Sequence, residues 1–182
     1  MKWLIIYNRF ANGGGSLAVL SQVEKAVKAV GVDYDKLHTA EDGSLAPPSW
    51  QEYEKVALVG GDGTLHRLLN TWGVPPIPLC LISGGSGNDF SRLAQGTASL
   101  KEQIHHFIHG QTSNVDLGRC NGVWFATGVG IGFDGEVARI LNKNSRFKGH
   151  LAYLLVVILQ IFRYKEKEIE VSHDGGIEKG PS

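Results

Sequence analysis

The stretch Lys55-Val-Ala-Leu-Val-Gly-Gly-Asp-Gly-Thr-Leu-His-Arg-Leu-Leu-Asn70 joins a short strand, a glycine-rich turn and a helix. Residues 55–59 form an apolar, partly β-branched run that stops at a double glycine, which predicts a buried strand. After Thr64, leucine and tryptophan side chains recur at i, i+3, i+4 and i+7, the spacing of one helix face, until Gly73 ends the pattern. Such strand–turn–helix units build parallel sheets with helices on their faces.

The turn between this strand and helix is Gly60-Gly61-Asp62-Gly63-Thr64. Glycines at a helix N-terminus let several backbone N–H groups approach one anion, and the helix dipole favours negative charge there. Asp62 would repel a phosphate unless its carboxylate holds a water, a neighbouring N–H or a divalent cation. The alternative is a tight turn without a ligand, in which the aspartate only caps the helix. Two further glycine-rich loops at strand ends, residues 8–16 and 83–89, favour phosphate binding.

Strands and helices alternate along the chain up to about residue 108. Apolar runs predict strands at 3–7, 34–38 and 77–82, and helical spacing predicts helices at 16–30, 88–94 and 100–108. Ser16 is expected to cap the first of these helices, and Ser99 with Glu102 to form a capping box on the last. The predicted fold class is therefore α/β with a parallel sheet. Ligands of such sheets bind at the carboxyl ends of the strands, where all three glycine-rich loops lie.

The pattern changes near residue 113. The elements predicted from there on are a hairpin of strands at 115–120 and 123–127 around Asn121-Gly122, a helix from Phe133, an apolar helix at 149–162 and a strand at 168–173. The apolar helix is expected in the core, and a lipid-facing or membrane-docking role is the alternative. This last strand finds no partner in the sequence. We therefore predict a nucleotide-binding α/β domain at residues 1–112 and, at 113–182, part of a β-rich second domain whose remainder lies beyond Ser182.

Composition argues against several classes of function. Lys and Arg together number 18, as do Asp and Glu, so no basic surface for nucleic acid or anionic lipid is predicted. Cys80 and Cys120 have no zinc or redox spacing and are expected to be reduced thiols of a cytosolic protein. The N-terminus does not read as a signal peptide, and the apolar stretch at 151–162 is shorter than the roughly 18 residues of a membrane span. His105 and His109 have no third ligand nearby, so no metal site is predicted there.

Known nucleotide motifs narrow the choice. The chain has no G-x-x-x-x-G-K-[ST] and no G-x-G-x-x-G after a strand, which excludes a P-loop and a dinucleotide Rossmann site. Five motifs follow one another instead: Asn8 with the glycines behind it, Thr39, Gly60-Gly-Asp-Gly-Thr64, Gly85-Ser-Gly-Asn-Asp-Phe90 and Val115-Asp-Leu-Gly118. In their order and spacing over residues 1–135 they resemble the diacylglycerol kinase catalytic domain family, which includes bacterial lipid kinases, sphingosine kinases and ceramide kinases. NAD kinases share Gly-Gly-Asp-Gly-Thr but carry an Asn-Glu motif that is not found here.

The resemblance implies a phosphofructokinase-like α/β nucleotide domain followed by a β-rich domain, with ATP and Mg²⁺ in the cleft between them. It implies transfer of the γ-phosphate of ATP to the hydroxyl of a diacylglycerol or sphingoid lipid, a reaction that depends on positioning and charge neutralisation. The positions that match the family's motifs imply these nucleotide contacts: Asn8, Arg9, Asn12, Thr39, Gly60, Gly61, Asp62, Gly63, Thr64, Gly85, Ser86 and Asn88. They imply catalytic roles for Asp62, Asp89 and Asp116, with Asp62 next to the metal, directly or through a water.

Several positions depart from the family pattern. Arg9 replaces the usual proline after Asn8, Ser83-Gly84 replaces Pro-Leu, Ser86 replaces threonine, and His66-Arg67 replaces Asn-Glu. Arg67 inverts a charge beside the phosphate turn, while the Ser86 hydroxyl can still donate to a phosphate. The acidic general base of the family is implied to lie beyond Ser182. These 182 residues are therefore expected to bind ATP but to transfer phosphate weakly or not at all.

The implied setting is a cytoplasmic protein without a transmembrane segment that touches a membrane surface transiently, where its lipid substrate resides. No nucleic-acid partner is expected, and a homodimer stays open. Three functions remain: an ATP-dependent lipid kinase, a kinase that phosphorylates a soluble hydroxyl such as that of NAD, and a nucleotide-binding module without catalysis.

Overall fold

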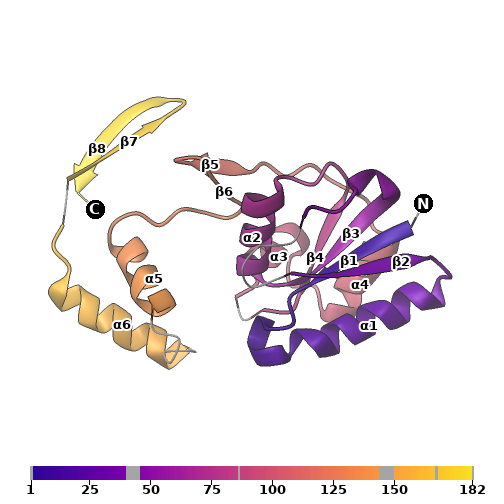
Figure 1. The fold of residues 1–182 in the computed structure, drawn as a ribbon. Helices are drawn as coiled ribbons and strands as arrows, with labels where there is room; N and C mark the ends of the chain where they lie inside the picture. The colour runs from indigo at the N-terminus through magenta and orange to yellow at the C-terminus, as the bar shows by residue number, and fades with distance from the viewer. Residues whose placement is uncertain (1, 40–45, 86, 144–149, 167, 182) are drawn as a thin grey trace. The chain divides into compact units, whose positions relative to one another are not determined.

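The computed structural model describes the chain except for residues 1, 40–45, 86, 144–149, 167 and 182 (Figure 1). Contacts between residues divide the chain into two compact units, Met1–Thr127 and Gly128–Ser182. The boundary that we predicted between residues 112 and 113 concerns the domains of the family and stays a prediction.

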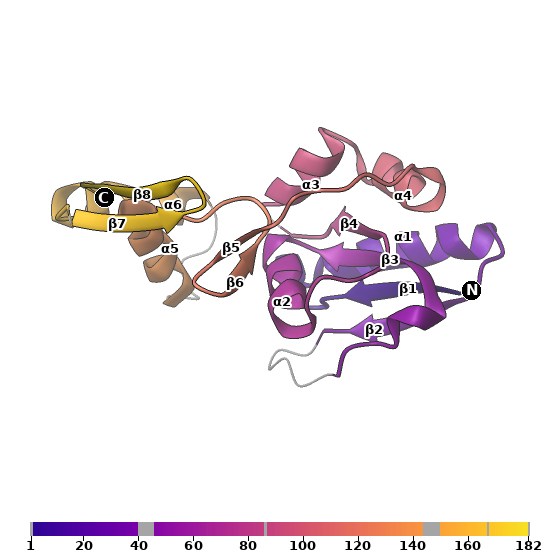
Figure 2. The same cartoon turned by 90° about the horizontal axis from the view of Figure 1, so that it is seen from above.

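A parallel sheet of four strands forms the centre of the first unit. Its strands are β1 (Lys2–Tyr7), β2 (Tyr34–His38), β3 (Tyr53–Gly60) and β4 (Leu79–Ser83). They lie side by side in the order β2-β1-β3-β4, from bottom to top in Figure 2, so β4 is an edge strand. Each pairing is parallel, which confirms the predicted fold class and brings the carboxyl ends of β1, β3 and β4 together.

Helices cover both faces of this sheet. They are α1 (Ser16–Ala29), α2 (Asp62–Trp72), α3 (Asp89–Gln95) and α4 (Leu100–His109), with short 3₁₀ turns at Ala11–Gly14 and Trp50–Glu52. Successive side chains of a strand point to opposite faces. Trp3 and Ile5 accordingly join one core cluster with α1 and α4, while Leu4 and Ile6 join a second cluster with α2. Burial on both faces explains the continuous apolar runs from which the strands were predicted.

Of the two predicted serine caps, one is confirmed and one is wrong. Ser99 Oγ accepts a hydrogen bond from the N–H of Glu102, whose carboxylate accepts from the N–H of Ser99, so the capping box is present. At α1 the capping position is Gly15, and Ser16 is the first helical residue. Its buried hydroxyl instead donates to the carbonyl of Asn8, at the start of the glycine-rich loop, at 2.6 Å. Ser16 thus fastens the loop instead of the helix end.

A hairpin of β5 (Gly118–Cys120) and β6 (Val123–Phe125) ends the first unit. Its turn residues Asn121 and Gly122 both have positive φ, as predicted for this dipeptide. The side-chain amide of Asn70 on α2 holds β6 in place: it accepts from the N–H of Trp124 at 2.8 Å and donates to the carbonyl of the same residue at 3.0 Å.

The second unit contains α5 (Phe133–Lys143), α6 (His150–Arg163), β7 (Glu168–His173) and β8 (Gly176–Pro181). The prediction that residues 168–173 have no partner is wrong, because β7 pairs antiparallel with β8 from Glu168 opposite Pro181 to His173 opposite Gly176. β8 was not predicted from the sequence, because glycine and proline within it weaken the alternation of apolar and polar residues that marks a strand.

The prediction that α6 is a core helix is also wrong. Within the described part of this unit α6 packs against α5, and Val156 is buried, but Phe162 is 84% exposed. The large apolar side chains that α6 exposes are Tyr153, Leu154, Leu155, Ile158, Leu159, Ile161 and Phe162. The helix carries apolar side chains of its own on more than one side, and one neighbouring helix can cover only one side of it. No helix in the described ranges has the length and apolar content to cross a membrane.

The two cysteines are free and differ in environment. Cys80 lies on β4 beneath α4, and burial raises the pKa of its thiol to about 11. Since the thiolate is the reactive form, a thiol reagent at pH 8 is expected to modify one cysteine of the native chain, Cys120, and two after denaturation. Counting modified thiols with and without guanidinium tests this. Two thiols titrated rapidly in the native protein would show that Cys80 is accessible.

Candidate active site

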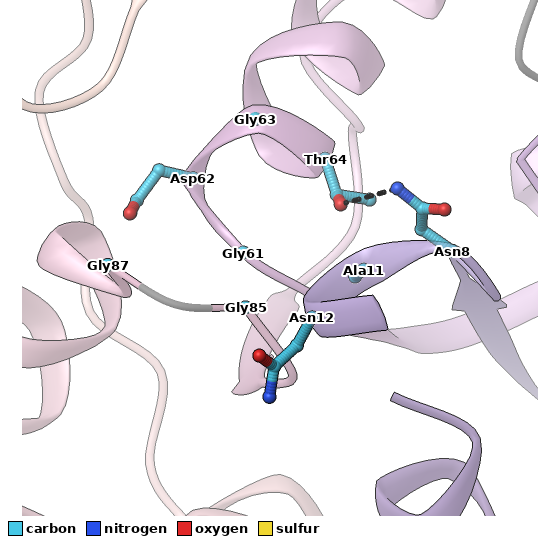
Figure 3. A pocket seen from close by; sticks show the side chains of 9 residues that line it. All are labelled: Asn8, Ala11, Asn12, Gly61, Asp62, Gly63, Thr64, Gly85 and Gly87. Atoms are coloured by element: carbon cyan, nitrogen blue, oxygen red, sulfur yellow. Dashed lines mark hydrogen bonds between the residues drawn. The ribbon is translucent and has the colours of Figure 1, made fainter. Parts of the chain in front are cut away.

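The three glycine-rich loops meet in one pocket at the carboxyl ends of β1, β3 and β4 (Figure 3). The pocket has a volume of about 260 Å³ and is lined by Asn8, Ala11, Asn12, Gly61, Asp62, Gly63, Thr64, Gly85 and Gly87. All but Ala11 and Gly87 were predicted from the sequence. Gly87 lies within a quoted motif, and Ala11 lies within the first glycine-rich loop, so both belong to segments that were predicted.

The first loop is tied to the second by Asn8, which follows β1. Its side-chain oxygen accepts from the N–H of Phe10 at 3.0 Å, and its side-chain nitrogen donates to Thr64 Oγ1 at 3.3 Å, the dashed line in Figure 3. Asn12 and Gly13 then adopt left-handed φ angles of 52° and 62°, which turn the chain back toward α1. The predicted role of Asn8 as a nucleotide contact stays a prediction, but the structure assigns its amide a structural task as well.

The second turn leaves no room for side chains on its first two glycines. A Cβ on Gly60 would lie 2.5 Å from Thr64 Oγ1, and a Cβ on Gly61 would lie 3.0 Å from the Cα of Gly85 in the third loop. Thr64 is itself buried and belongs to the first turn of α2. The first N–H groups of a helix lack intrahelical partners, so this turn presents backbone donors and a positive dipole end to the pocket.

Asp62 holds the third loop through its carboxylate. Its two oxygens accept from the N–H groups of Asp89 and Phe90 at 3.0 and 2.9 Å, at the start of α3. Of the three partners that the sequence left open, the structure thus supplies a neighbouring N–H. Hydrogen bonds to a carboxylate are among the stronger ones in proteins, so Asp62 links the start of α2 to the start of α3. Each oxygen keeps a further lone pair, and the predicted metal contact stays a prediction.

The third loop is closed by Asn88, whose φ of 61° is left-handed. Its side-chain oxygen accepts from the N–H of Gly85 at 3.1 Å, and its nitrogen donates to the carbonyl of the same glycine at 2.9 Å. These two reciprocal hydrogen bonds hold Gly85 next to the second turn, where a Cβ on Gly85 would lie 2.6 Å from the Cα of Gly61. Ser86, predicted to contact the nucleotide, lies outside the described residues.

The structure brings two of the three predicted catalytic acids together, since the Asp62 carboxylate accepts from the N–H of Asp89 at 3.0 Å. Asp89 is exposed and its carboxylate pairs with Arg92 one turn later in α3. Asp116 is exposed in the segment before β5. Among the hydrogen bonds and ion pairs of the described residues, none joins Asp116 to Asp62 or Asp89. Their catalytic roles stay predictions.

Thr39 and Arg9 are predicted nucleotide contacts that are not among the residues lining the pocket. Thr39 follows β2 and is buried, and both its N–H and its hydroxyl donate to the carbonyl of Tyr7. Arg9 is exposed, with its guanidinium 4.5 Å from the centre of the Phe10 ring. His66 and Arg67, which replace Asn-Glu of the family, lie on the exposed face of α2 and do not line the pocket.

The charge of the pocket matters for what it can bind. Among the described residues that line it, Asp62 is the one ionisable residue, and none is a lysine or an arginine. A phosphate there would meet backbone N–H groups and the dipole of α2 but no side-chain cation. In the described ranges no cluster of three or more His, Cys, Asp or Glu side chains could hold a metal. The lining therefore fits a phosphate chain whose charge is partly neutralised by a divalent cation that it brings with it.

Comparison with known proteins agrees with this geometry. The profile of the family described as diacylglycerol kinase catalytic domain matches residues 2–120. The chain therefore belongs to the diacylglycerol kinase catalytic domain family.

Similar proteins include diacylglycerol kinases of bacteria. A diacylglycerol kinase of Mycobacterium tuberculosis is 30% identical over 128 residues, which are 67% of this chain and 41% of the relative. A diacylglycerol kinase of Bacillus subtilis is 28% identical over 152 residues, which are 80% of this chain and 48% of the relative. A crystal structure of a diacylglycerol kinase from Bacillus anthracis has a TM-score of 0.67 at 25% identity, covering 99% of this chain and 61% of that chain. The chain thus spans about half the length of the curated relatives it matches.

Proposed function

We propose that this chain is the nucleotide-binding part of a lipid kinase that transfers the γ-phosphate of ATP to the hydroxyl of a diacylglycerol-like lipid. One observation supports the proposal most strongly. Three loops, each at the carboxyl end of a parallel strand, form a pocket whose glycines at 61 and 85 exclude any side chain between them. Backbone that comes so close to a ligand site is typical of phosphate binding.

In this proposal the residues of the chain bind and orient the phosphates. The N-terminal turn of α2 donates backbone hydrogen bonds, while Asn8 and Asn88 fix the loops on either side of it. Mg²⁺ would supply the positive charge that the lining lacks, with Asp62 as the nearest carboxylate. Because the loops are already held by the protein, little reorganisation is needed when charge develops on the transferred phosphoryl group.

The acceptor is proposed from the relatives named above, which are diacylglycerol kinases. The lipid would be reached at a membrane surface, which the protein touches transiently from the cytoplasm. A soluble acceptor such as NAD, and a module that binds nucleotide without catalysis, are the alternatives to this proposal.

Calorimetry and a transfer assay test the proposal together. We expect ATP to bind with Mg²⁺ and to bind more weakly when EDTA removes the cation, because the described lining of the pocket contains no lysine or arginine. Radiolabelled ATP is then offered to diacylglycerol in mixed micelles and, in parallel, to NAD. Label in the lipid supports the proposal. Label in NAD alone supports the soluble-acceptor alternative, and binding without any transfer, also in a longer form of the protein, supports the non-catalytic one.

A further inference from the structure

Helices α3 and α4 lie beyond the outer edge of β4 in Figure 2, and a side chain from each of them bonds to this strand. Alternate residues of β4 point their backbone groups toward β3, as shown by the hydrogen bond from the N–H of Gly84 to the carbonyl of Gly60 at 2.7 Å. Leu81 and Ser83 therefore point theirs to the other side, where the described part of the chain adds no further strand to the sheet. Unpaired backbone groups at a buried edge are costly, so partners are required there.

Two glutamine side chains provide these partners. Gln95, the last residue of α3, donates through Nε2 to the carbonyl of Leu81 at 2.7 Å. Gln103 on α4 accepts through Oε1 from the N–H of Ser83 at 2.8 Å. In a parallel sheet one residue of a neighbouring strand would make this same pair of bonds, donating to one residue and accepting from the second residue after it. The two amides thus replace a strand at the point where β4 ends.

Gln103 is the more constrained of the two glutamines. Its side chain is 6% exposed, and its Nε2 donates to the carbonyl of Ala98 at 2.9 Å. A backbone N–H can only donate and a carbonyl can only accept, so these two partners determine the orientation of the amide. The Ser83 hydroxyl also donates a hydrogen bond to Ser91 Oγ at 3.0 Å, which links the end of β4 to α3.

We propose that Gln103 is a positioning residue of the phosphate pocket. By holding the N–H of Ser83 it determines where the third glycine-rich loop leaves β4, and two residues later Gly85 packs against Gly61 with no space for a Cβ. The width of the pocket between the second and third loops therefore depends on a side chain that does not line it. A proline at position 83 would have no N–H for Gln103 to accept from, whereas Ser83 supplies this donor. This inference rests on the proposed function, because it gives the pocket its phosphate-binding role.

Gln103→Met tests the proposal, since methionine has a similar length but cannot accept from the N–H of Ser83. We expect the Kd for MgATP to rise about 10-fold, the change that corresponds to one buried hydrogen bond lost. Hydrogen exchange at the Ser83 and Gly84 amides, followed by NMR, is expected to quicken by a similar factor beyond any change in global stability. Gln103→Glu keeps an oxygen that can accept from Ser83 and is expected to bind MgATP more tightly than Gln103→Met.

Phe107→Leu is the matched control, because Phe107 lies on the same helix, is buried in the core cluster against Trp3 and is not among the residues that line the pocket. It is expected to lower stability while leaving the Kd and the exchange at Ser83 unchanged. Wild-type affinity in Gln103→Met, or the same loss of affinity in Phe107→Leu, would overturn the proposal. If the wild-type chain itself fails to bind MgATP, the proposed function is wrong; unchanged exchange at Ser83 in Gln103→Met separately overturns the anchoring role.

Discussion

Gly85→Ala is expected to lower the affinity for MgATP by at least about 10²-fold, because a displacement of about 1 Å in a positioning site has effects of this size. The added Cβ would lie 2.6 Å from the Cα of Gly61 and 3.1 Å from Asn88 Oδ1. The nearest of these atoms belongs to backbone, which cannot rotate away as a flexible side chain can. The third loop must therefore move out from the second, and the phosphate cradle between them opens.

The same variant should also be less stable, by about 1–3 kcal/mol in the free energy of unfolding, as for other overpacked sites. Gly63→Ala provides the comparison, since a Cβ there meets no atom within 4 Å and alanine favours the first turn of α2. It should be at least as stable as the wild type. Calorimetry with MgATP and urea denaturation measure the two quantities. Wild-type affinity in Gly85→Ala would mean that the phosphates do not bind between these loops.

Asp62→Ala is expected to weaken MgATP binding about 10²-fold and to lower the free energy of unfolding by about 1–2 kcal/mol. This loss of stability is smaller than that for two fully buried charge-assisted hydrogen bonds, because water can reach the site. The variant leaves the N–H groups of Asp89 and Phe90 without their carboxylate, so the start of α3 and the third loop lose their link to α2. Two effects compete here. Removing a negative charge from the pocket favours phosphate, whereas releasing the loop disfavours it.

Binding of ATP without Mg²⁺ separates these two effects. If the carboxylate acts mainly by repulsion, Asp62→Ala should bind metal-free ATP more tightly than the wild type, and that result would contradict the anchoring role. We expect weaker binding under both conditions. Asp89→Ala serves as the stability control, since the carboxylate it removes pairs with Arg92 at the surface, where an ion pair contributes no more than about 1 kcal/mol.

Some predictions failed where the sequence pattern was weak or where burial was assumed from apolar character. β8 was missed because Gly176, Gly180 and Pro181 interrupt the alternation of apolar and polar residues in this strand. Its pairing with β7 depends instead on backbone groups, which the residues between these three provide whatever their side chains. The helix at 150–163 was expected in the core because it is apolar, yet an apolar sequence does not specify how many neighbours a helix has. Ser16 was taken for a helix cap, but the nearest acceptor for its hydroxyl is a carbonyl eight residues earlier in the chain.

The sequence by itself determined the alternation of strands and helices and the positions of the three glycine-rich loops. It also determined that these loops meet at the carboxyl ends of the parallel strands. These features follow from periodicity and from the handed, parallel geometry of α/β units, which act over short stretches of chain. The tertiary structure decided the partners of the polar side chains. Asp62 holds the start of α3, 27 residues away, and Gln103 holds the end of β4, 20 residues away. A side chain's hydrogen bonds depend on which donors folding brings within about 3 Å of it, and that proximity is a property of the packed molecule and not of local sequence.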